Sequence, residues 1–183
     1  MSFLRRSLFL LLCSLTSLAS ASEQLTAPVA SLRQMTRHSG YIFAGTVVSV
    51  GPVEPVNPNQ LPVMRITFRV DQAIRGVRAG QLLEVRQWAG LWESGDRYHV
   101  GERLLLFLYP PSKLGLTSSV SGSLGRFAMN SDGEVLVQEA QQAALSDLPL
   151  SGGAPSQPIL KIPRAAPRLS SRDFARAIRR VEQ

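Results

Sequence analysis

The sequence contains a single cysteine, and its position limits how the chain can be stabilised. Cys13 lies within residues 1–21, which carry two arginines, then an apolar stretch, then the small residues Ala19-Ser20-Ala21. These are the charged, apolar and cleavage regions of a secretory signal peptide, so we expect cleavage after Ala21. Cleavage would leave no cysteine, and we therefore expect a fold without disulfides that depends on its apolar core.

Two alternatives for this segment are a retained membrane anchor and a lipoprotein signal with Cys13 as the lipidated residue. The apolar stretch is roughly a dozen residues, short of the about 20 that span a bilayer. Leu12 stands where lipidation would need a small residue, and the apolar stretch continues past the cysteine. We therefore predict a secreted or periplasmic protein with no transmembrane segment after signal cleavage.

Residues 22–145 carry the pattern of one mainly β domain. Two segments are apolar on both faces and favour central strands, and one segment alternates strictly between apolar and polar residues. Gly45 inside the first strand indicates a bulge or bend. About six strands are expected, after an early helix over residues 28–38, and they form a curled sheet or small barrel. The strand segments are Tyr41–Val50, Met64–Val70, Leu82–Trp88, Glu102–Tyr109, Arg126–Met129 and Glu134–Val137, the last two joined by the turn Asn130–Gly133.

The excess positive charge lies in the C-terminal part of the chain. Residues 22–157 hold 11 basic and 11 acidic residues, so the domain is neutral, although the whole chain has a formal net charge of +7. Residues 146–168 are rich in proline and glycine and predict a linker. Residues 169–183 predict a short basic amphipathic helix, with Phe174, Ile178 and Val181 on one face.

No catalytic or metal-binding constellation stands out. The chain has two histidines and lacks both a nucleophile-elbow motif and a phosphate-binding loop. His99 and Glu102 are three residues apart, but in an extended segment that spacing puts side chains on opposite faces. We therefore predict a chain that is not an enzyme and that takes no metal and no cofactor.

The loop after the third strand carries large aromatic residues that suggest a recognition surface. Exposed tryptophan and tyrosine give large contact area at low entropic cost, and we expect Trp92 to be the more exposed tryptophan. The alternative is that these side chains plug the end of a small barrel. The candidate binding residues are Trp88, Trp92, Tyr98 and His99.

The C-terminal helix is the second candidate binding element. Its arginines suit attachment to an anionic surface, such as lipid headgroups or an acidic polymer. The alternative is that its apolar face docks on the domain and the arginines only face water. Nucleic acid is disfavoured as a partner because an exported chain rarely meets it. The candidate residues are Arg172, Arg176, Arg179 and Arg180.

Between residues 29 and 137 a series of short motifs occurs in a fixed order: Tyr41–Val48, Ile66–Val70, Ile74–Gly76, Trp88–Gly90, Gly95–Tyr98 and Gly101–Phe107. This order resembles the netrin-like or TIMP-like group of OB-fold domains. It implies an OB-fold-like Greek-key barrel with a flanking helix, here as a bacterial-type exported member without cysteines. The zinc-binding N-terminal cysteine of that group's protease inhibitors has no counterpart, so no inhibitory residue is carried over.

These observations favour a secreted, non-enzymatic binding module that contacts a protein or an envelope component. One alternative is a regulator or inhibitor of an exported metalloprotease. Another is a barrel that binds an anionic ligand or a carbohydrate. The sequence leaves the partner open.

Overall fold

The structure is a computed structural model that describes residues 31–57, 59–93, 97–145 and 168–181. The expected signal peptide and nearly all of the expected linker lie outside the described residues. None of the helices in the described part of the chain is long and apolar enough to cross a membrane.

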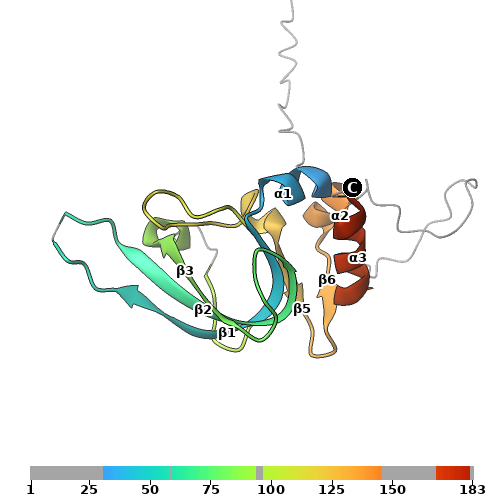
Figure 1. The fold of residues 1–183 in the computed structure, drawn as a ribbon, viewed down its shortest axis with the longest axis horizontal. Coiled ribbons are helices and arrows are strands. Elements are labelled where there is room, and N and C mark those ends of the chain that lie inside the picture. The colour runs from blue at the N-terminus through green and yellow to red at the C-terminus, as the bar shows by residue number, and fades with distance from the viewer. Residues whose placement is uncertain (1–30, 58, 94–96, 146–167, 182–183) are drawn as a thin grey trace, which may run out of the picture.

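The described chain is mainly β, as predicted from the sequence, with a few short helices around one antiparallel sheet (Figure 1). Helix α1 precedes the sheet, α2 follows β6, and α3 follows β7. Two 3₁₀ turns, Ala89–Trp92 and Gly122–Gly125, lie in the connections. The bounds are α1 Leu32–His38, β1 Tyr41–Val53, β2 Val63–Arg75, β3 Leu82–Trp88, β4 Arg103–Leu108, β5 Arg126–Met129, β6 Glu134–Leu136, α2 Glu139–Leu145, β7 Arg168–Ser170 and α3 Ser171–Val181.

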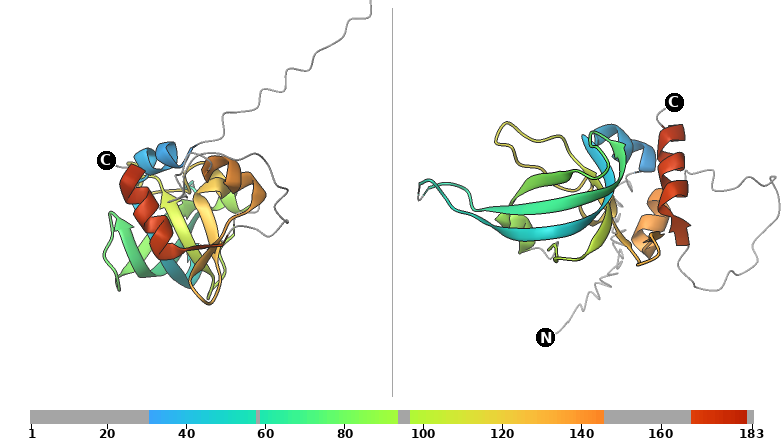
Figure 2. Two further views of the ribbon diagram at one scale, coloured as in Figure 1. Left: turned by 90° about the vertical axis from the view of Figure 1, so that its right-hand side faces the viewer. Right: turned by 60° about the horizontal axis from the view of Figure 1, so that its bottom comes forward.

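The sheet has the strand order β3-β2-β1-β4-β5-β6-β7 and is strongly curved (Figures 1 and 2). It is not closed into a barrel by a full ladder of hydrogen bonds. Two isolated bridges instead link the segment after β4 to the neighbouring strands: Arg86 of β3 pairs with Leu116, and Leu108 of β4 pairs with Ser119. The predicted curled sheet is therefore present, with an opening between β3 and β4.

Residues 42–45 of β1 and 104–108 of β4 are buried on both faces, as their apolar patterns predicted, whereas β1 becomes exposed from Val48, and these buried parts separate two apolar cores. Phe43 and Leu106 lie in the core on the concave side of the sheet with β2 and β3. Ile42 and Phe107 lie in the other core, which the helices cover. Alternating side chains of one strand thus serve two cores, which explains why residues 42–45 and 104–108 include no polar side chain.

The predicted irregularity at Gly45 is a shift in the pairing of β1 with β2, between Ala44 and Gly45. A Cβ atom at Gly45 would lie 2.6 Å from the carbonyl oxygen of Arg69, so only glycine allows this close approach of the two backbones. The shift helps β1 bend while it stays paired with both neighbours.

The first helix is shorter than expected because a capping box fixes its start. The Ser31 side chain accepts a hydrogen bond from the Gln34 backbone N–H, and the Gln34 side chain accepts one from the Ser31 N–H. The helix therefore begins at Leu32. Residues 28–30, which the sequence placed in it, lie outside the described residues.

The C-terminal segment differs from the expected linker and helix boundaries. Arg168–Ser170, expected as the end of the linker and the start of the helix, pairs with β6 and forms edge strand β7. Helix α3 then begins at Ser171 and packs on the domain. Phe174 lies 5.2 Å from the Phe127 ring and 6.3 Å from the Phe107 ring, between ring centroids. The helix is thus part of the fold, and its apolar residues Phe174 and Ile178 are core residues.

Candidate functional site

The structure separates the four residues that the sequence grouped into one recognition surface. Trp88 points to the outer face of the sheet opposite Val63 and is 46% exposed. Trp92 is only partly exposed and packs against the concave core, so the expectation that Trp92 is the more exposed tryptophan is wrong. Trp88 is the outward residue at the end of β3, whereas Trp92 is the last residue of the 3₁₀ turn that follows and packs against the concave core.

Tyr98 is the aromatic residue around which the end of the sheet is organised. Its side chain is only 4% exposed and lies in edge-on contact with Phe68, with ring centroids 5.5 Å apart. The Trp92 ring packs against it at 6.3 Å. Tyr98 and Trp92 therefore fill the end of the concave core, as the plugging alternative predicted, and they form no exposed aromatic surface.

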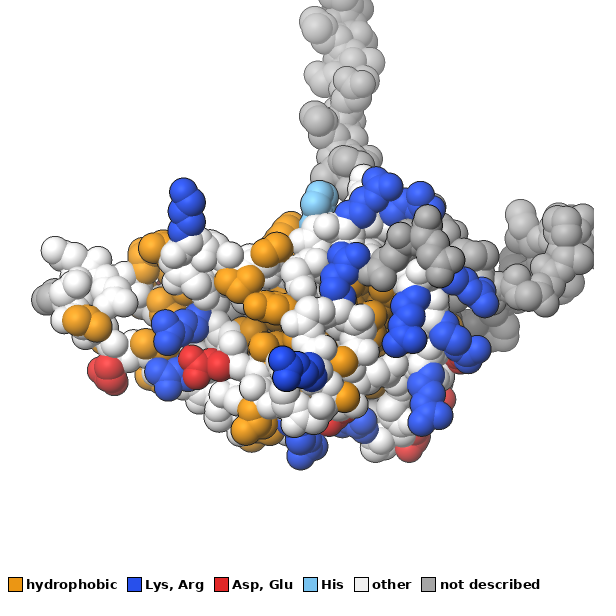
Figure 3. Space-filling model, in the orientation of Figure 1, with side chains coloured by type: hydrophobic (Ala, Val, Ile, Leu, Met, Phe, Trp, Pro, Cys, Tyr) orange, Lys and Arg blue, Asp and Glu red, His pale blue; other side chains and the backbone are white. Residues whose placement is uncertain are grey.

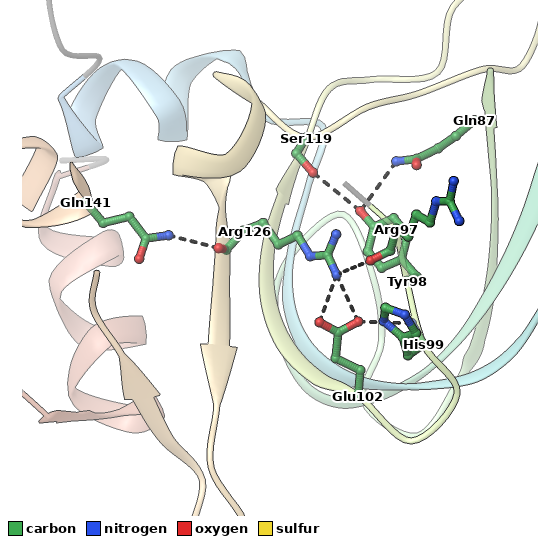
Figure 4. Close-up of polar contacts among 8 residues, drawn as sticks. All are labelled: Gln87, Arg97, Tyr98, His99, Glu102, Ser119, Arg126 and Gln141. Carbon is green, nitrogen blue, oxygen red and sulfur yellow. Dashed lines mark hydrogen bonds and ion pairs between the residues drawn. The ribbon is translucent and has the colours of Figure 1, made fainter. Parts of the chain in front are cut away.

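Arg126, at the start of β5, ties this aromatic end to the loop before β4 (Figure 4). Its guanidinium Nη2 donates to both carboxylate oxygens of Glu102, at 2.8 and 2.9 Å, and to the carbonyl oxygen of Arg97 at 2.6 Å. The same guanidinium lies 4.2 Å from the centroid of the Tyr98 ring. The charge of Arg126 is thus paired with Glu102 and also stacks on an aromatic face.

His99 and Glu102 lie close together without forming a metal site. The His99 backbone N–H, and not its ring, donates to Glu102 Oε2 at 3.1 Å. Glu102 is already engaged by Arg126, and the His99 side chain is exposed. In the described ranges no three His, Cys, Asp or Glu side chains converge as a metal site would require.

A pocket of about 280 Å³ lies at the opening between β3 and β4. Among the described residues, its lining provides an amide and five hydroxyl groups and no charged side chain. We call it the polar pocket. Its polar lining residues are Gln87, Tyr98, Tyr109, Ser118, Ser119 and Ser121.

Hydrogen bonds inside the polar pocket converge on the Tyr98 hydroxyl (Figure 4). Gln87 Nε2 donates to Tyr98 Oη at 3.4 Å, and Ser119 Oγ shares a hydrogen bond with the same oxygen at 3.4 Å. Of the four predicted residues, only Tyr98 reaches this pocket. A signal for Gln87 was available, because it occupies an inward position of β3 after the apolar Leu83 and Val85.

A second group of functional candidates is the basic surface over α1 and α3. In α3 the arginines are exposed on the side opposite the buried Phe174 and Ile178. Helix α1 packs beside α3 (Figure 2) and adds the exposed Arg33 and Arg37, which were not among the predicted site residues. Arg33 and Arg37 are four residues apart, and residues with this spacing lie on the same face of a helix. The helix expected over residues 28–38 could therefore have predicted that the two arginines lie side by side. We call this surface the basic face, formed by Arg33, Arg37, Arg172, Arg176, Arg179 and Arg180.

Only one acidic residue of α3, Asp173, lies among these arginines, and it pairs with Arg176. The attraction between the two charges of an exposed ion pair is weak, typically less than about 1 kcal/mol. The basic face therefore keeps a strong excess of positive charge. Figure 3 shows Lys and Arg side chains gathered over α1 and α3, while acidic side chains are sparse there.

Comparison with protein-family models, with curated proteins and with solved structures finds no match to this chain.

Proposed function

We propose that this chain is an exported, non-enzymatic binding module that attaches to an anionic phospholipid surface through its basic face. The observation that carries the proposal is the docking of α3. Because Phe174 and Ile178 are held in the core and α3 contacts α1, the four arginines of α3 share one part of the surface with the arginines of α1 (Figure 3).

Docking of α3 also defines the kind of attachment. A free amphipathic helix binds a membrane by burying its apolar face among the acyl chains. The apolar face of α3 is already buried against Phe107 and Phe127, so it is not available to lipid. Attachment would therefore be electrostatic, with about 1 kcal/mol for each arginine that reaches the headgroups.

An electrostatic attachment is specific for charge and sensitive to salt. Screening shortens the range of a charge interaction from about 10 Å at 0.1 M salt to about 3 Å at 1 M. Attachment by insertion of apolar side chains would not weaken in this way. A salt titration of vesicle binding therefore distinguishes electrostatic attachment from insertion of apolar side chains.

The test is sedimentation of the exported protein, with its N-terminus verified by mass spectrometry, together with phospholipid vesicles. We expect binding to vesicles that contain phosphatidylglycerol, none to pure phosphatidylcholine vesicles, and release of the bound protein at high salt. Equal binding to both lipids, or binding that resists salt, would contradict the proposal. Retention by an acidic polysaccharide with no retention by vesicles would also count against it, because the anionic partner would then be a polymer.

A further inference from the structure

The polar pocket contains a buried amide with unused hydrogen-bonding capacity. Gln87 is only 3% exposed, and among the described residues its side chain makes a single hydrogen bond, the one donated to Tyr98 Oη. A glutamine side chain offers two donors and an acceptor oxygen. Because Gln87 lines the pocket, its amide can pair with a ligand that donates or accepts a hydrogen bond there.

The rest of the lining narrows the chemistry of that ligand. Hydroxyl groups of Tyr109, Ser118 and Ser121 can each donate and accept, and they match a partner whose groups do the same. In the part of the chain that the structure describes, no cation lines the pocket, and the nearby guanidinium of Arg126 is occupied by Glu102. A carboxylate or phosphate would therefore find no opposite charge, whereas a neutral polyhydroxyl compound would find a donor or acceptor on every side.

The size of the pocket limits the ligand to one compact unit. Pockets for small molecules have volumes of roughly 300 to 1,000 Å³, and this one, at about 280 Å³, is at the lower end. The ring of Tyr109 and the side chain of Leu91 supply apolar wall. Such a mixture of apolar wall and few directed polar groups is typical of a small-molecule site.

The backbone at the pocket is held in an uncommon conformation. Ser121 has φ of +57°, and it is the one residue other than glycine with positive φ among those described. Its side chain makes no capping hydrogen bond to the turn that follows. Conformations of this kind cost of order 1–3 kcal/mol and are concentrated at ligand sites.

We infer that the polar pocket binds one neutral sugar unit, with Gln87 and the hydroxyls around it as hydrogen-bonding partners and Tyr109 as its exposed wall. The site is separate from the basic face. The two binding activities are therefore independent, and loss of either one leaves the other measurable.

The test is an NMR titration of the ¹⁵N-labelled exported protein with the methyl glycosides of glucose, galactose, mannose and N-acetylglucosamine. At least one glycoside should give saturable shifts at the backbone amides of residues 118–122, with a dissociation constant in the range of about 1 mM. Gln87→Met preserves side-chain length and removes the amide, and it should weaken binding about tenfold. Tyr109→Ala alters the exposed wall and should also weaken it. Gln72→Met on β2, outside the pocket, is the matched control and should bind like the wild type.

Several outcomes would overturn the inference. The first is that none of the four glycosides causes saturable shifts, so that only water fills the pocket. The second is that the Tyr109→Ala and Gln87→Met proteins bind the glycoside with the same dissociation constant as the wild type. The NMR spectra of both variants must be as dispersed as that of the wild type, which shows that they are folded. The third is that a capped neutral dipeptide shifts residues 118–122 while every glycoside fails to, which would assign the pocket to peptide.

Discussion

The guanidinium group of Arg126 lies over the ring of Tyr98, 4.2 Å from its centroid. The contact joins the polar network around Glu102 to the aromatic end of the concave core, and the hydroxyl of the same tyrosine faces the polar pocket. One arginine thereby positions a residue that closes the core and lines the candidate sugar site.

Replacing Arg126 should destabilise the protein more than replacing an arginine of an exposed ion pair. The side chains of Arg126 and Glu102 are 13% and 27% exposed, so Arg126→Met leaves a partly buried carboxylate without its charged partner, with the His99 backbone N–H as a remaining donor. We expect the free energy of unfolding in urea to fall by about 2–3 kcal/mol. Arg65→Met removes the exposed Arg65–Glu84 pair and should change it by less than about 1 kcal/mol. Similar losses for both variants would show that the network is as weak as a surface pair.

Helix α3 should behave as part of the cooperative fold. Phe174→Ala removes a ring that packs on Phe107 and Phe127, and it should lower the free energy of unfolding by about 3–5 kcal/mol. Arg172→Ala on the exposed side of the same helix should cost less than about 0.5 kcal/mol. Urea denaturation measures both values. A Phe174→Ala loss no larger than that of Arg172→Ala would mean that α3 does not pack on the domain.

Two glycines in the connection from β2 to β3 allow a matched test of backbone packing. Both have positive φ, +71° at Gly76 and +80° at Gly80, but only Gly76 lies against another backbone, where a Cβ would overlap the Gly40 carbonyl oxygen. Gly80→Ala should cost about 1–2 kcal/mol for the left-handed conformation alone. Gly76→Ala should lower the free energy of unfolding by about 1–3 kcal/mol more than Gly80→Ala does, because of the added steric overlap. Thermal unfolding of the two variants measures the difference, and equal losses would contradict the close approach of the two backbones.

The strands could be predicted from the sequence where the pattern of apolar residues lies within a single segment. The alternation of Met64–Val70 and the two-sided apolar segments around Phe43 and Phe107 each follow from the period of a strand. The hairpin turn was also predictable, because the Asn130 side chain accepts hydrogen bonds from the N–H groups of Asp132 and Glu134.

The parts that were missed depend on contacts between distant segments. Arg168–Ser170 is too short to carry a strand pattern and becomes β7 only because β6 offers it an edge. Helix α2 was not expected, and its buried Gln141 is held by the carbonyl oxygens of Ser123 and Arg126. The polar pocket combines Gln87 of β3, Tyr98, Tyr109 just after β4 and residues 118–122, so no local motif contains it.

The central claim is that the basic face attaches the protein to anionic lipid, and matched charge variants test it most directly. Arg172, Arg176, Arg179 and Arg180 are replaced together by glutamine, which keeps helix propensity close to that of arginine. The control replaces Arg65, Arg69, Arg78 and Arg86, exposed arginines on or beside β2 and β3 at the other end of the strand order, and it removes the same charge.

The decisive measurement is the affinity of these two variants and the wild type for phosphatidylglycerol vesicles at about 0.1 M salt. At about 1 kcal/mol for each arginine near the surface, the α3 variant should bind more than about a hundredfold more weakly than the wild type. The control variant should lose less than about tenfold. Equal losses in the two variants would show that only net charge matters, and an α3 variant that binds like the wild type would contradict the claim outright.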